Sequence, residues 1–502
     1  MMVTRMKKPD GFDSLIYGQD PQCRITMDWT KTQCNSNGIV MGPSGCGKSW
    51  NFVVPCLAHM EHTNPVVIVT KKSTMEMTAK LLKKHGYHNN YLNFVDPKKK
   101  DYGYDPMHYC KRNTDATDLA YTLTHSGGGA IPQDPFWDDS AQQIADVVFR
   151  FVKNGHYPGG SRMIDGVELL DSVHPCDQYN QVEFDDDDAD DMEEEPEQEE
   201  ESLRFERTGP RFPFRRLSPV GSDNDAKPCI ERIERRFPTE SRRPSRIFDE
   251  DDLDDEWCKE FQAKHPLHYA MRRLAEINKK DFGIWAAFND GADRTSASIA
   301  STLNSHIAKA FPDEIREILR KPKQFDFRKL LRPKQALFVY ISPVNESQHR
   351  FVSIFYHQMF KVLFEMGEAQ PDGRLPYPVH VICDDFATGC PIPNFDKTIS
   401  IFREKGISAT MLIQSETQLT NLYGRAAAQT IINNCDTIAY LGGMDLETCS
   451  SVAKRANMPL EDVISLPIGW EIFFHRGRKP ILTKSYDLLK DPVYQAEIEG
   501  ER

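Results

Sequence analysis

The chain has 502 residues, of which 39% are hydrophobic, with 12 cysteines and a formal net charge of −13. This length suits two or three domains with a sizeable core and excludes a small fold held by disulfides. The cysteines form neither a C-x-x-C pair nor a zinc-type cluster, so we expect reduced thiols in a cytoplasmic protein. No window approaches the roughly 18 to 20 apolar residues that cross a bilayer, and no signal-peptide core is found near the start. We therefore expect no transmembrane segment in this chain.

A glycine-rich turn near the start of the chain lies between an apolar strand, "GIVM", and a helical run, "WNFVVPCLA". The turn fits G-x-x-x-x-G-K-[ST] and consists of Gly42, Pro43, Ser44, Gly45, Cys46, Gly47, Lys48 and Ser49. The glycines let backbone amides point into one concavity, Lys48 brings charge to the β- and γ-phosphates, and Ser49 would ligate Mg²⁺. A chance glycine-rich turn is the alternative, but the flanking strand and helix favour a site for a nucleoside triphosphate.

Short apolar runs alternate with helical patterns along most of the chain. They are "GIVM", "PVVIVT", "YLNFV", "QALFVYIS", "PVHVIC", "SATMLI", "DTIAYL" and "WEIFF". Near-continuous apolar strands separated by helices indicate a parallel sheet covered on both faces, hence an α/β core.

Strand signals vanish between about 141 and 311, where the spacing of apolar residues is helical, as in "DSAQQIADVVFRFVKNG" and "RTSASIASTLNSHIAKAF". We predict a mostly helical domain at 141–311, inserted between the first part of a nucleotide-binding domain, 1–140, and its second part, 312–502. The long apolar-faced helix of "ESQHRFVSIFYHQMFKVLFEMGE" would resume the α/β core by packing.

A highly charged segment, 183–256, lies within the predicted helical domain. It holds 27 acidic and 12 basic residues, which leaves 50 basic and 48 acidic residues for the rest of the chain. The segment has little to bury, so we expect disorder. It is interpreted as a solvated insertion, with a regulatory or docking arm as the alternative; its charges could also fold against each other or shield a basic surface. Net charge neither supports nor excludes a nucleic-acid partner.

Two carboxylates end a predicted buried strand in "VHVICDDFA". Asp384 would lie near Mg²⁺, and Asp385 could orient or deprotonate the attacking water. In the alternative interpretation both merely cap the following turn. Because Lys48 and Asp384 are far apart in sequence, a large domain must interrupt the nucleotide-binding fold.

These motifs resemble those of the coupling proteins of type IV secretion and conjugation, the TraG/TraD-like ATPases, especially those of Gram-positive conjugative elements. The resemblance covers nearly the whole chain outside the charged segment and is most specific in "FDK", "REKGIS" and "QS" after the Asp384 strand. It implies a RecA-like hexameric motor that brings DNA and its bound relaxase to the secretion channel. It also implies that Arg403 is offered to a neighbouring subunit's nucleotide and that Gln414 senses the γ-phosphate. Without the resemblance, Arg403 would be read as a solvated helix residue.

Three departures from the family are visible. Members usually carry Asp-Glu where this chain has Asp384 and Asp385, and "DPKGE" where it reads "TKKST" at 70–74, so that Lys72 alone keeps the match. Many members also begin with membrane helices that we do not find here, so a partner would have to provide any attachment to the inner face of the membrane.

We therefore expect an ATPase that uses ATP and Mg²⁺ to deliver DNA, with single strands as the expected form, or relaxase-bound DNA to a type IV secretion channel. We expect a homo-hexamer and either the channel or a membrane anchor protein as a further partner. One alternative is a DNA translocase outside secretion. The other is a docking platform that binds ATP without hydrolysing it, which the Asp385 and "TKKST" departures favour.

Overall fold

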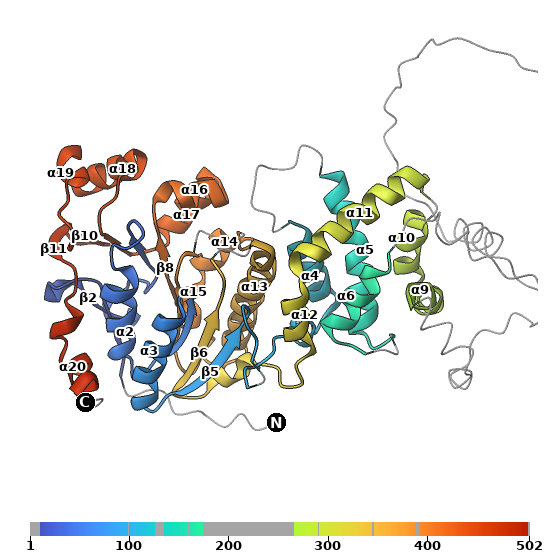
Figure 1. The fold of residues 1–502 in the computed structure, drawn as a ribbon, viewed down its shortest axis with the longest axis horizontal. Coiled ribbons are helices and arrows are strands. Elements are labelled where there is room, and N and C mark those ends of the chain that lie inside the picture. Colours follow the sequence, from blue (N-terminus) through green and yellow to red (C-terminus); the bar gives the residue numbers. More distant parts are fainter. Residues whose placement is uncertain are drawn as a thin grey trace, which may run out of the picture.

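The computed structural model describes residues 11–98, 100–125, 135–157, 160–173, 266–289, 291–343, 346–386, 389 and 391–499. An α/β lobe built on a central sheet lies beside a helical lobe (Figure 1). The helices of the second lobe fall between the fifth and sixth strands in sequence, so they interrupt the α/β lobe. The domain division at 141 and 311 stays a prediction, and the charged segment at 183–256 lies outside the described residues.

A sheet of nine strands forms the centre of the α/β lobe, in the order β11-β10-β9-β3-β8-β7-β4-β6-β5. The strands are β3 (Gly38–Met41), β4 (Asn64–Val69), β5 (His88–Asn93), β6 (Gln335–Tyr340), β7 (Val379–Cys383), β8 (Ile407–Ile413), β9 (Thr437–Tyr440), β10 (Trp470–His475) and β11 (Ile481–Lys484). Every strand expected from the sequence is present, and β11 is additional. A separate antiparallel pair, β1 (Ser14–Ile16) and β2 (Arg24–Thr26), was also not predicted.

All pairings from β9 to β5 are parallel, whereas β10 pairs antiparallel with both β9 and β11. The tight turn between β10 and β11 includes Gly477, whose φ of 79° favours glycine. The alternation of strands and helices did not predict this reversal. Parallel strands place their carboxyl ends along one edge of the sheet, and the site described below lies there.

Both faces of the sheet are covered, because alternate residues of a strand join different cores. In β3, Ile39 and Met41 pack on one face and Val40 on the other. The Val40 face is covered by α2 (Val54–Ala58) and α3 (Lys72–Lys84). Helices that pack in the other core include α13 (Glu346–Glu368), α14 (Phe395–Ser400), α16 (Glu416–Tyr423), α17 (Arg425–Asn433) and α18 (Leu446–Ala456).

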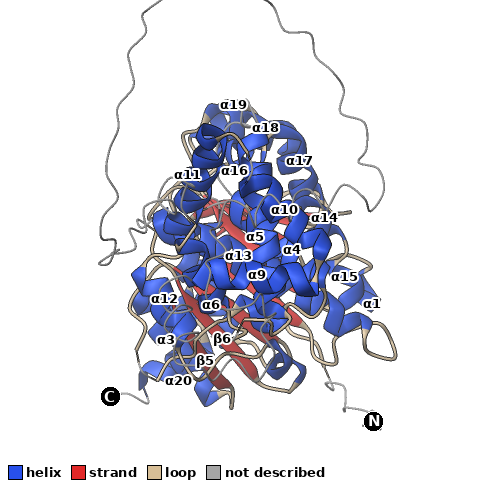
Figure 2. Ribbon diagram, turned by 90° about the vertical axis from the view of Figure 1, so that its right-hand side faces the viewer, coloured by secondary structure: helices blue, strands red, loops and turns tan. Residues whose placement is uncertain are grey.

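The helical lobe stands against α13, in front of the sheet in Figure 2. Its helices are α4 (Asn113–His125), α5 (Phe136–Lys153), α6 (Met163–Asp171), α9 (Pro266–Ile277), α10 (Lys279–Asn289), α11 (Asp293–Ala310) and α12 (Asp313–Arg320). Arg350 of α13 reaches into the lobe, with Nη1 2.6 Å from His306 Nδ1, and His306 Nε2 lies 2.8 Å from Asp138 Oδ1. A guanidinium only donates, so Nδ1 accepts and Nε2–H donates.

Short elements complete the described chain. They are η1 (Pro21–Cys23), α1 (Trp29–Thr32), η3 (Pro106–Tyr109), η6 (Phe327–Leu331), α15 (Phe402–Lys405), α19 (Leu460–Ile464), η8 (Leu488–Lys490) and α20 (Pro492–Glu499). Across the described residues, no helix combines the length and the apolar character that a membrane span requires.

Candidate nucleotide-binding site

The phosphate turn, residues 42–49, follows β3 at the carboxyl edge of the sheet. Gly45 and Gly47 have φ values of 82° and 91°, in the left-handed region that favours glycine. Gly42 is required for a different reason, since a Cβ there would lie 2.7 Å from Cys46 Sγ. The glycines therefore fix a tight turn whose tip, 43–45, is exposed.

Lys48 lies inside this turn, with 7% of its surface exposed. Its Nζ donates hydrogen bonds to the carbonyl oxygens of Gly42 at 2.6 Å and Pro43 at 3.1 Å. The ammonium is thus held at the centre of the turn by backbone carbonyls rather than by a carboxylate. A phosphate entering the turn can take over these hydrogen bonds, because Lys48 provides a charge that it can approach.

The helix that leaves the turn begins as a π-helical turn, η2 (Ser49–Val53), and continues as α2. The first turn of this helix is stabilised by a 2.7 Å hydrogen bond from the Asn51 N–H to the Gly47 carbonyl. Ser49 is half-buried at the start of this helix, directly after Lys48. Burial raises the pKa of the Cys46 thiol, and the charge of Lys48 offsets only part of that rise, so Cys46 stays protonated.

Asp384 follows β7 and is almost fully buried. Burial raises the pKa of its carboxyl to about 6; the neighbouring Asp385 adds to the rise, and the charges of Lys71 and Lys48 offset part of it. Within the described part of the chain, Asp384 Oδ2 is buried without a hydrogen-bond partner. Such an oxygen fits a hard cation such as Mg²⁺, which binds oxygen ligands and needs few from the protein.

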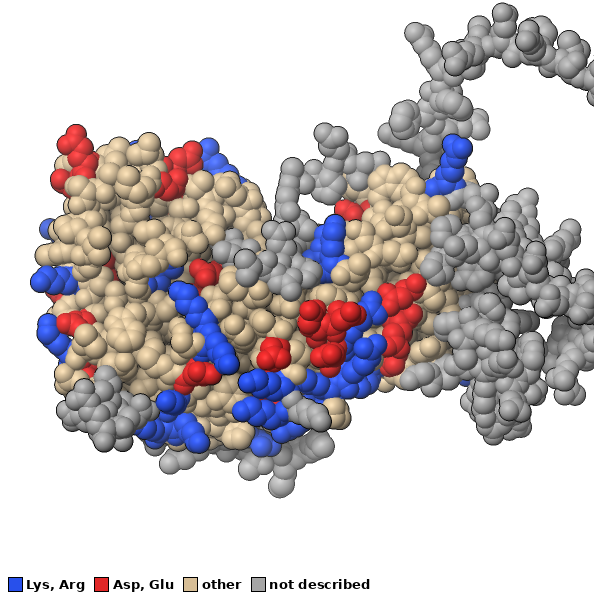
Figure 3. Space-filling view, in the orientation of Figure 1, with Lys and Arg blue, Asp and Glu red and all other residues tan. Residues whose placement is uncertain are grey.

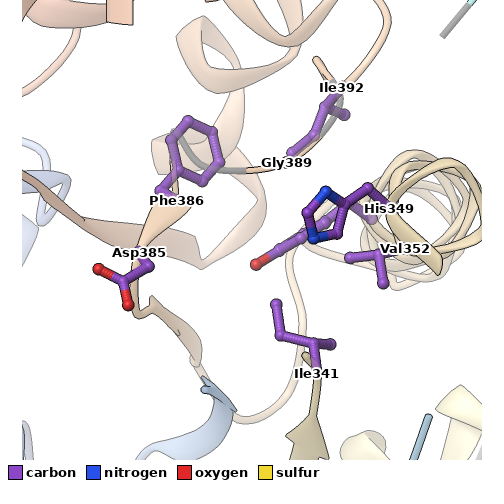
Figure 4. Close-up of a pocket in the computed structure, with 8 residues that line it drawn as sticks. Ile341, His349, Val352, Asp385, Phe386, Gly389 and Ile392 are labelled. Atoms are coloured by element: carbon purple, nitrogen blue, oxygen red, sulfur yellow. The ribbon is translucent and has the colours of Figure 1, made fainter. Parts of the chain in front are cut away.

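Asp385 adopts a left-handed backbone conformation, with φ 49°. Its Oδ2 accepts a hydrogen bond from Thr70 Oγ1 at 3.0 Å. The residue also borders a small pocket whose other walls are largely apolar and in which α13 contributes His349. Figure 4 shows the Asp385 carboxylate turned away from the His349 ring, so the backbone turn and Thr70 together fix where this carboxylate points.

Gln414 follows β8, which lies between β3 and β7 in the sheet. It is exposed, and its backbone N–H donates to Gln418 Oε1 at 3.1 Å. The strand order thus brings Gln414 to the same edge as the phosphate turn and Asp384, with Gln414 between them. Its predicted contact with the γ-phosphate stays a prediction.

Arg403 lies elsewhere. It belongs to α15, which precedes β8, and is therefore at the opposite, amino edge of the sheet. The exposed side chain donates from Nη1 to the Gln33 carbonyl at 3.0 Å, and Arg476 Nη2 donates to the same oxygen at 2.9 Å. β8 alone spans about 20 Å, so Arg403 does not join the phosphate turn of its own chain.

Thr70 and Lys71 contribute to the site but were missed from the sequence, where only Lys72 was singled out. Thr70 holds Asp385, and Lys71 lowers the pKa of Asp384. Lys72 instead lies 3.9 Å from Glu76 on the exposed surface of α3. The signal was the position of "TK" at the end of a buried strand, but the sequence alone did not distinguish two successive lysines.

Two family models match the chain. The type IV secretory system conjugative DNA transfer model matches residues 6–197, which include the phosphate turn. The model described as the TraM recognition site of TraD and TraG matches residues 378–457, which include Asp384, Asp385, Arg403 and Gln414. A search of curated proteins returned no match to this chain.

Solved structures of a plasmid coupling protein have a similar fold. The bacterial conjugative coupling protein TrwBΔN70 with sulphate has a TM-score of 0.56 and 12% identity, over 90% of this chain and 85% of that chain. TrwB with ADP and Mg²⁺ has a TM-score of 0.54 and 13% identity, over 91% and 88%. TrwB with the non-hydrolysable ATP analogue ADPNP has a TM-score of 0.53 and 11% identity, over 91% and 87%. The predicted RecA-like P-loop fold is confirmed.

Proposed function

Because the chain belongs to the TraG/TraD-like coupling proteins of type IV secretion and conjugation, we propose that it binds ATP with Mg²⁺ at the phosphate turn and hydrolyses the ATP. Hydrolysis would drive the transfer of DNA, or of relaxase-bound DNA, into the secretion channel. The observation that carries this proposal is Asp384, a buried carboxylate at the same edge as Lys48, with an oxygen that no described residue partners. That the chain is most similar to family members from Gram-positive conjugative elements stays a prediction.

The donor set fits Mg²⁺, which Ser49 and Asp384 would hold. Bound there, the ion would offset negative charge that develops on the transferring phosphoryl group. Asp384 is suited to this task because burial and Asp385 make its charge costly, so a cation gains an oxygen that nothing else among the described residues occupies. A carboxylate whose oxygens already accepted hydrogen bonds would gain less free energy from binding the cation.

The phosphate turn would bind the triphosphate through its backbone amides. Lys48 would at the same time exchange its hydrogen bonds to the Gly42 and Pro43 carbonyls for contacts with the β- and γ-phosphates. Asp385 would then orient a water molecule whose oxygen attacks the γ-phosphorus, as the bond to the β,γ-bridging oxygen breaks. Thr70 keeps one carboxylate oxygen of Asp385 in place. Gln414, which follows β8 between β3 and β7, would contact the γ-phosphate.

Arg403 would act on the nucleotide of a neighbouring subunit in a homo-hexamer. Its position at the amino edge supports this role, since the side chain is exposed and separated from the turn of its own chain by the length of β8. An arginine that stabilises the charge of a transferring phosphoryl group can be supplied from another subunit. Single-stranded DNA, a relaxase, and a channel or membrane anchor protein are the proposed partners.

A docking platform that binds ATP without turnover is the second candidate. The aspartate at 385, one methylene shorter than the family's glutamate and already engaged by Thr70, favours it. Steady-state ATPase assays with and without single-stranded DNA separate the two functions. DNA-stimulated turnover supports the motor, whereas tight ATP binding without turnover supports the platform.

Two lysine variants complete this test. Lys48→Ala should lose high-affinity ATP binding while the fold stays intact, because Lys48 faces the turn's carbonyls rather than an apolar core. Lys72→Ala is the matched control, since this nearby lysine is exposed and lies beside Glu76. Unchanged ATP affinity in Lys48→Ala would refute the phosphate-turn assignment itself.

A further inference from the structure

Lysine side chains gather around Tyr102, which follows β5 at the edge of the sheet. The Nζ atoms of Lys323 and Lys329 lie 4.4 and 3.9 Å from the centre of its ring, and Lys329 also donates to the Tyr102 hydroxyl at 2.6 Å. Burial raises the pKa of Tyr102, but the two ammonium groups outweigh burial and lower it overall. Two positive charges thus share one aromatic ring.

Further lysines extend this cluster toward the helical lobe. Lys321 Nζ donates to the carbonyl of Lys98 at 2.6 Å, and Lys100 is exposed two residues later. We call the set the lysine surface: Lys98, Lys100, Lys321, Lys323 and Lys329. Figure 3 shows Lys and Arg side chains gathered along the lower edge of this face, below the position of α12 in Figure 1.

Three carboxylates near the lysine surface are paired with arginines, whereas Asp101 and Glu317 act on Lys321 through their charge, and Asp101 Oδ2 accepts from the Lys98 N–H at 3.1 Å. Asp326 binds Arg328 at 2.7 Å, Glu168 binds Arg320 at 2.7 Å, and Asp171 binds Arg316 at 2.5 Å. Among the described residues, no carboxylate forms an ion pair with a member of the lysine surface. Crowded like charges repel one another, so a partner with several negative charges would be attracted to this surface.

The chain itself carries such a partner. The run 183–201 has 14 acidic residues among 19 and no basic residue. Its carboxylates are distributed over 19 residues of sequence, which suits a surface of separated lysines better than it suits one buried pocket. A segment tethered to the same chain also acts at a high effective concentration, of the order of millimolar for a short flexible link.

The acidic run can reach the lysine surface. Arg162, at the start of α6, donates to the carbonyl of Lys321 at 3.2 Å, and α6 ends at Asp171. The rise of α6 is about 13 Å, so with the length of the Arg162 side chain the end of α6 lies within about 25 Å of Lys321. From Val173, the last described residue before the run, the chain to position 183 spans up to about 33 Å. The tether is therefore long enough.

We propose that the acidic run 183–201 binds the lysine surface of its own chain. Bound there, it competes with other polyanions for the surface, including nucleic acid. Salt or a stronger polyanion would release the run from the lysine surface.

Zero-length carbodiimide cross-linking of the full chain, followed by mass spectrometry, tests the proposal. We expect amide links between carboxylates of 183–201 and the lysine surface at low salt, with a yield about tenfold lower at 1 M salt, where the Debye length is about 3 Å. The variant Lys321→Gln/Lys323→Gln/Lys329→Gln should lose most links to this region. The control Lys279→Gln/Lys280→Gln, which removes two exposed lysines at the start of α10, should leave the yield of links to the lysine surface unchanged.

Three outcomes would overturn the proposal. One is a set of links spread evenly over exposed lysines, with no enrichment on the lysine surface. A second is links only between chains when ¹⁵N-labelled and unlabelled protein are mixed, since the partner would then be another copy. The third is an absence of links to the lysine surface combined with loss of oligo-dT binding, measured by fluorescence anisotropy, in the triple Lys→Gln variant; the surface would then belong to nucleic acid.

Discussion

At the amino edge of the sheet, both polar atoms of the buried Asn64 amide have hydrogen-bond partners, whereas at the carboxyl edge the buried carboxylate of Asp384 has an oxygen with none among the described residues. Asn64 Nδ2 donates to the carbonyls of Leu330 at 2.8 Å and Arg332 at 2.7 Å, and its Oδ1 accepts from the Gln335 N–H at 2.9 Å. Asp384 Oδ2 is buried and unpartnered. The polar atoms of Asn64 are satisfied by the chain, whereas one oxygen of Asp384 is left for a ligand.

The difference teaches where stability and function compete in this fold. A buried polar group that forms its hydrogen bonds stabilises the chain, while one that lacks them costs free energy unless a ligand binds. The left-handed backbone of Asp385 adds a cost at the carboxyl edge, and that of Lys334, directly before β6, adds one at the amino edge. We therefore expect substitutions of Asn64 and of Asp384 to change the free energy of unfolding in opposite directions.

Arg403 is the exception to this division, because it lies at the amino edge but is predicted to serve a carboxyl edge. Arg403→Ala should lower the ATPase turnover number by about a thousandfold if the guanidinium stabilises the transferring phosphoryl group. Mixing Arg403→Ala with Lys48→Ala subunits should restore part of the activity, because some interfaces would pair an intact turn with an intact arginine. ATPase assays of mixtures measure this.

Subunit exchange must be demonstrated in the same mixtures, for example by energy transfer between labelled chains. If subunits exchange and every mixture stays as inactive as its parents, Arg403 does not act across an interface.

Asp384→Asn should abolish Mg²⁺-dependent nucleotide binding and at the same time stabilise the unliganded chain. The folded carboxyl has a pKa of about 6 against a usual 3.8, so the folded state holds its proton to higher pH than the unfolded chain does. The unfolding free energy of the wild type should therefore fall as pH rises from about 4 to about 6, by up to about 3 kcal/mol. Urea unfolding at several pH values measures the difference, which should be largest above pH 6. A variant less stable than the wild type at pH 7.5 would contradict this.

Asn64→Ala should destabilise the chain and leave nucleotide binding intact, the reverse of Asp384→Asn. Two carbonyls and one N–H would lose their buried partner, so the unfolding free energy should fall by about 2 kcal/mol. ATP affinity at the distant edge should stay within error of the wild type. Loss of ATP affinity in a folded Asn64→Ala protein would show that the two edges are not independent.

Asp385→Glu should change the turnover number by a few-fold with little change in ATP affinity, because Lys48, Ser49 and Asp384 are untouched. We expect a modest rise if the shorter side chain leaves a gap to the water, and a fall if Thr70 has already fixed the aspartate in its working position. Asp385→Asn distinguishes a catalytic from a structural role. Wild-type turnover in Asp385→Asn would remove Asp385 from the mechanism.

Features that depend on residues close together in sequence could be predicted, whereas features that depend on distant residues or on very short strands could not. The turn at 42–49 and the strand before Asp384 are local patterns, so glycine spacing and apolar runs predicted them. The reversed β10 depends on a hairpin that closes at Gly477, and short strands such as Ser14–Ile16 carry too few residues for a periodic signal.

Details of the site depended on side-chain direction. Thr70 contacts Asp385, and Lys71 acts on Asp384 through its charge, because β4 ends there, whereas Lys72, the first residue of α3, lies beside Glu76. Two adjacent lysines carry the same composition signal, and only the change from strand to helix separates them. The position of Arg403 at the far edge likewise required the strand order.

If Lys48 binds phosphate as proposed, its present hydrogen bonds would give the site a means of selectivity among nucleotides. Because its ammonium already has two carbonyl acceptors, at 2.6 and 3.1 Å, every ligand must first displace the same pair of hydrogen bonds. Breaking these two hydrogen bonds costs the same free energy for a mono-, di- or triphosphate. The binding free energy gained in exchange would grow with each phosphate that the ammonium and the amides can reach. On this proposal the turn would bind weakly charged ligands poorly, and its discrimination would rise with phosphate number rather than with the identity of the base.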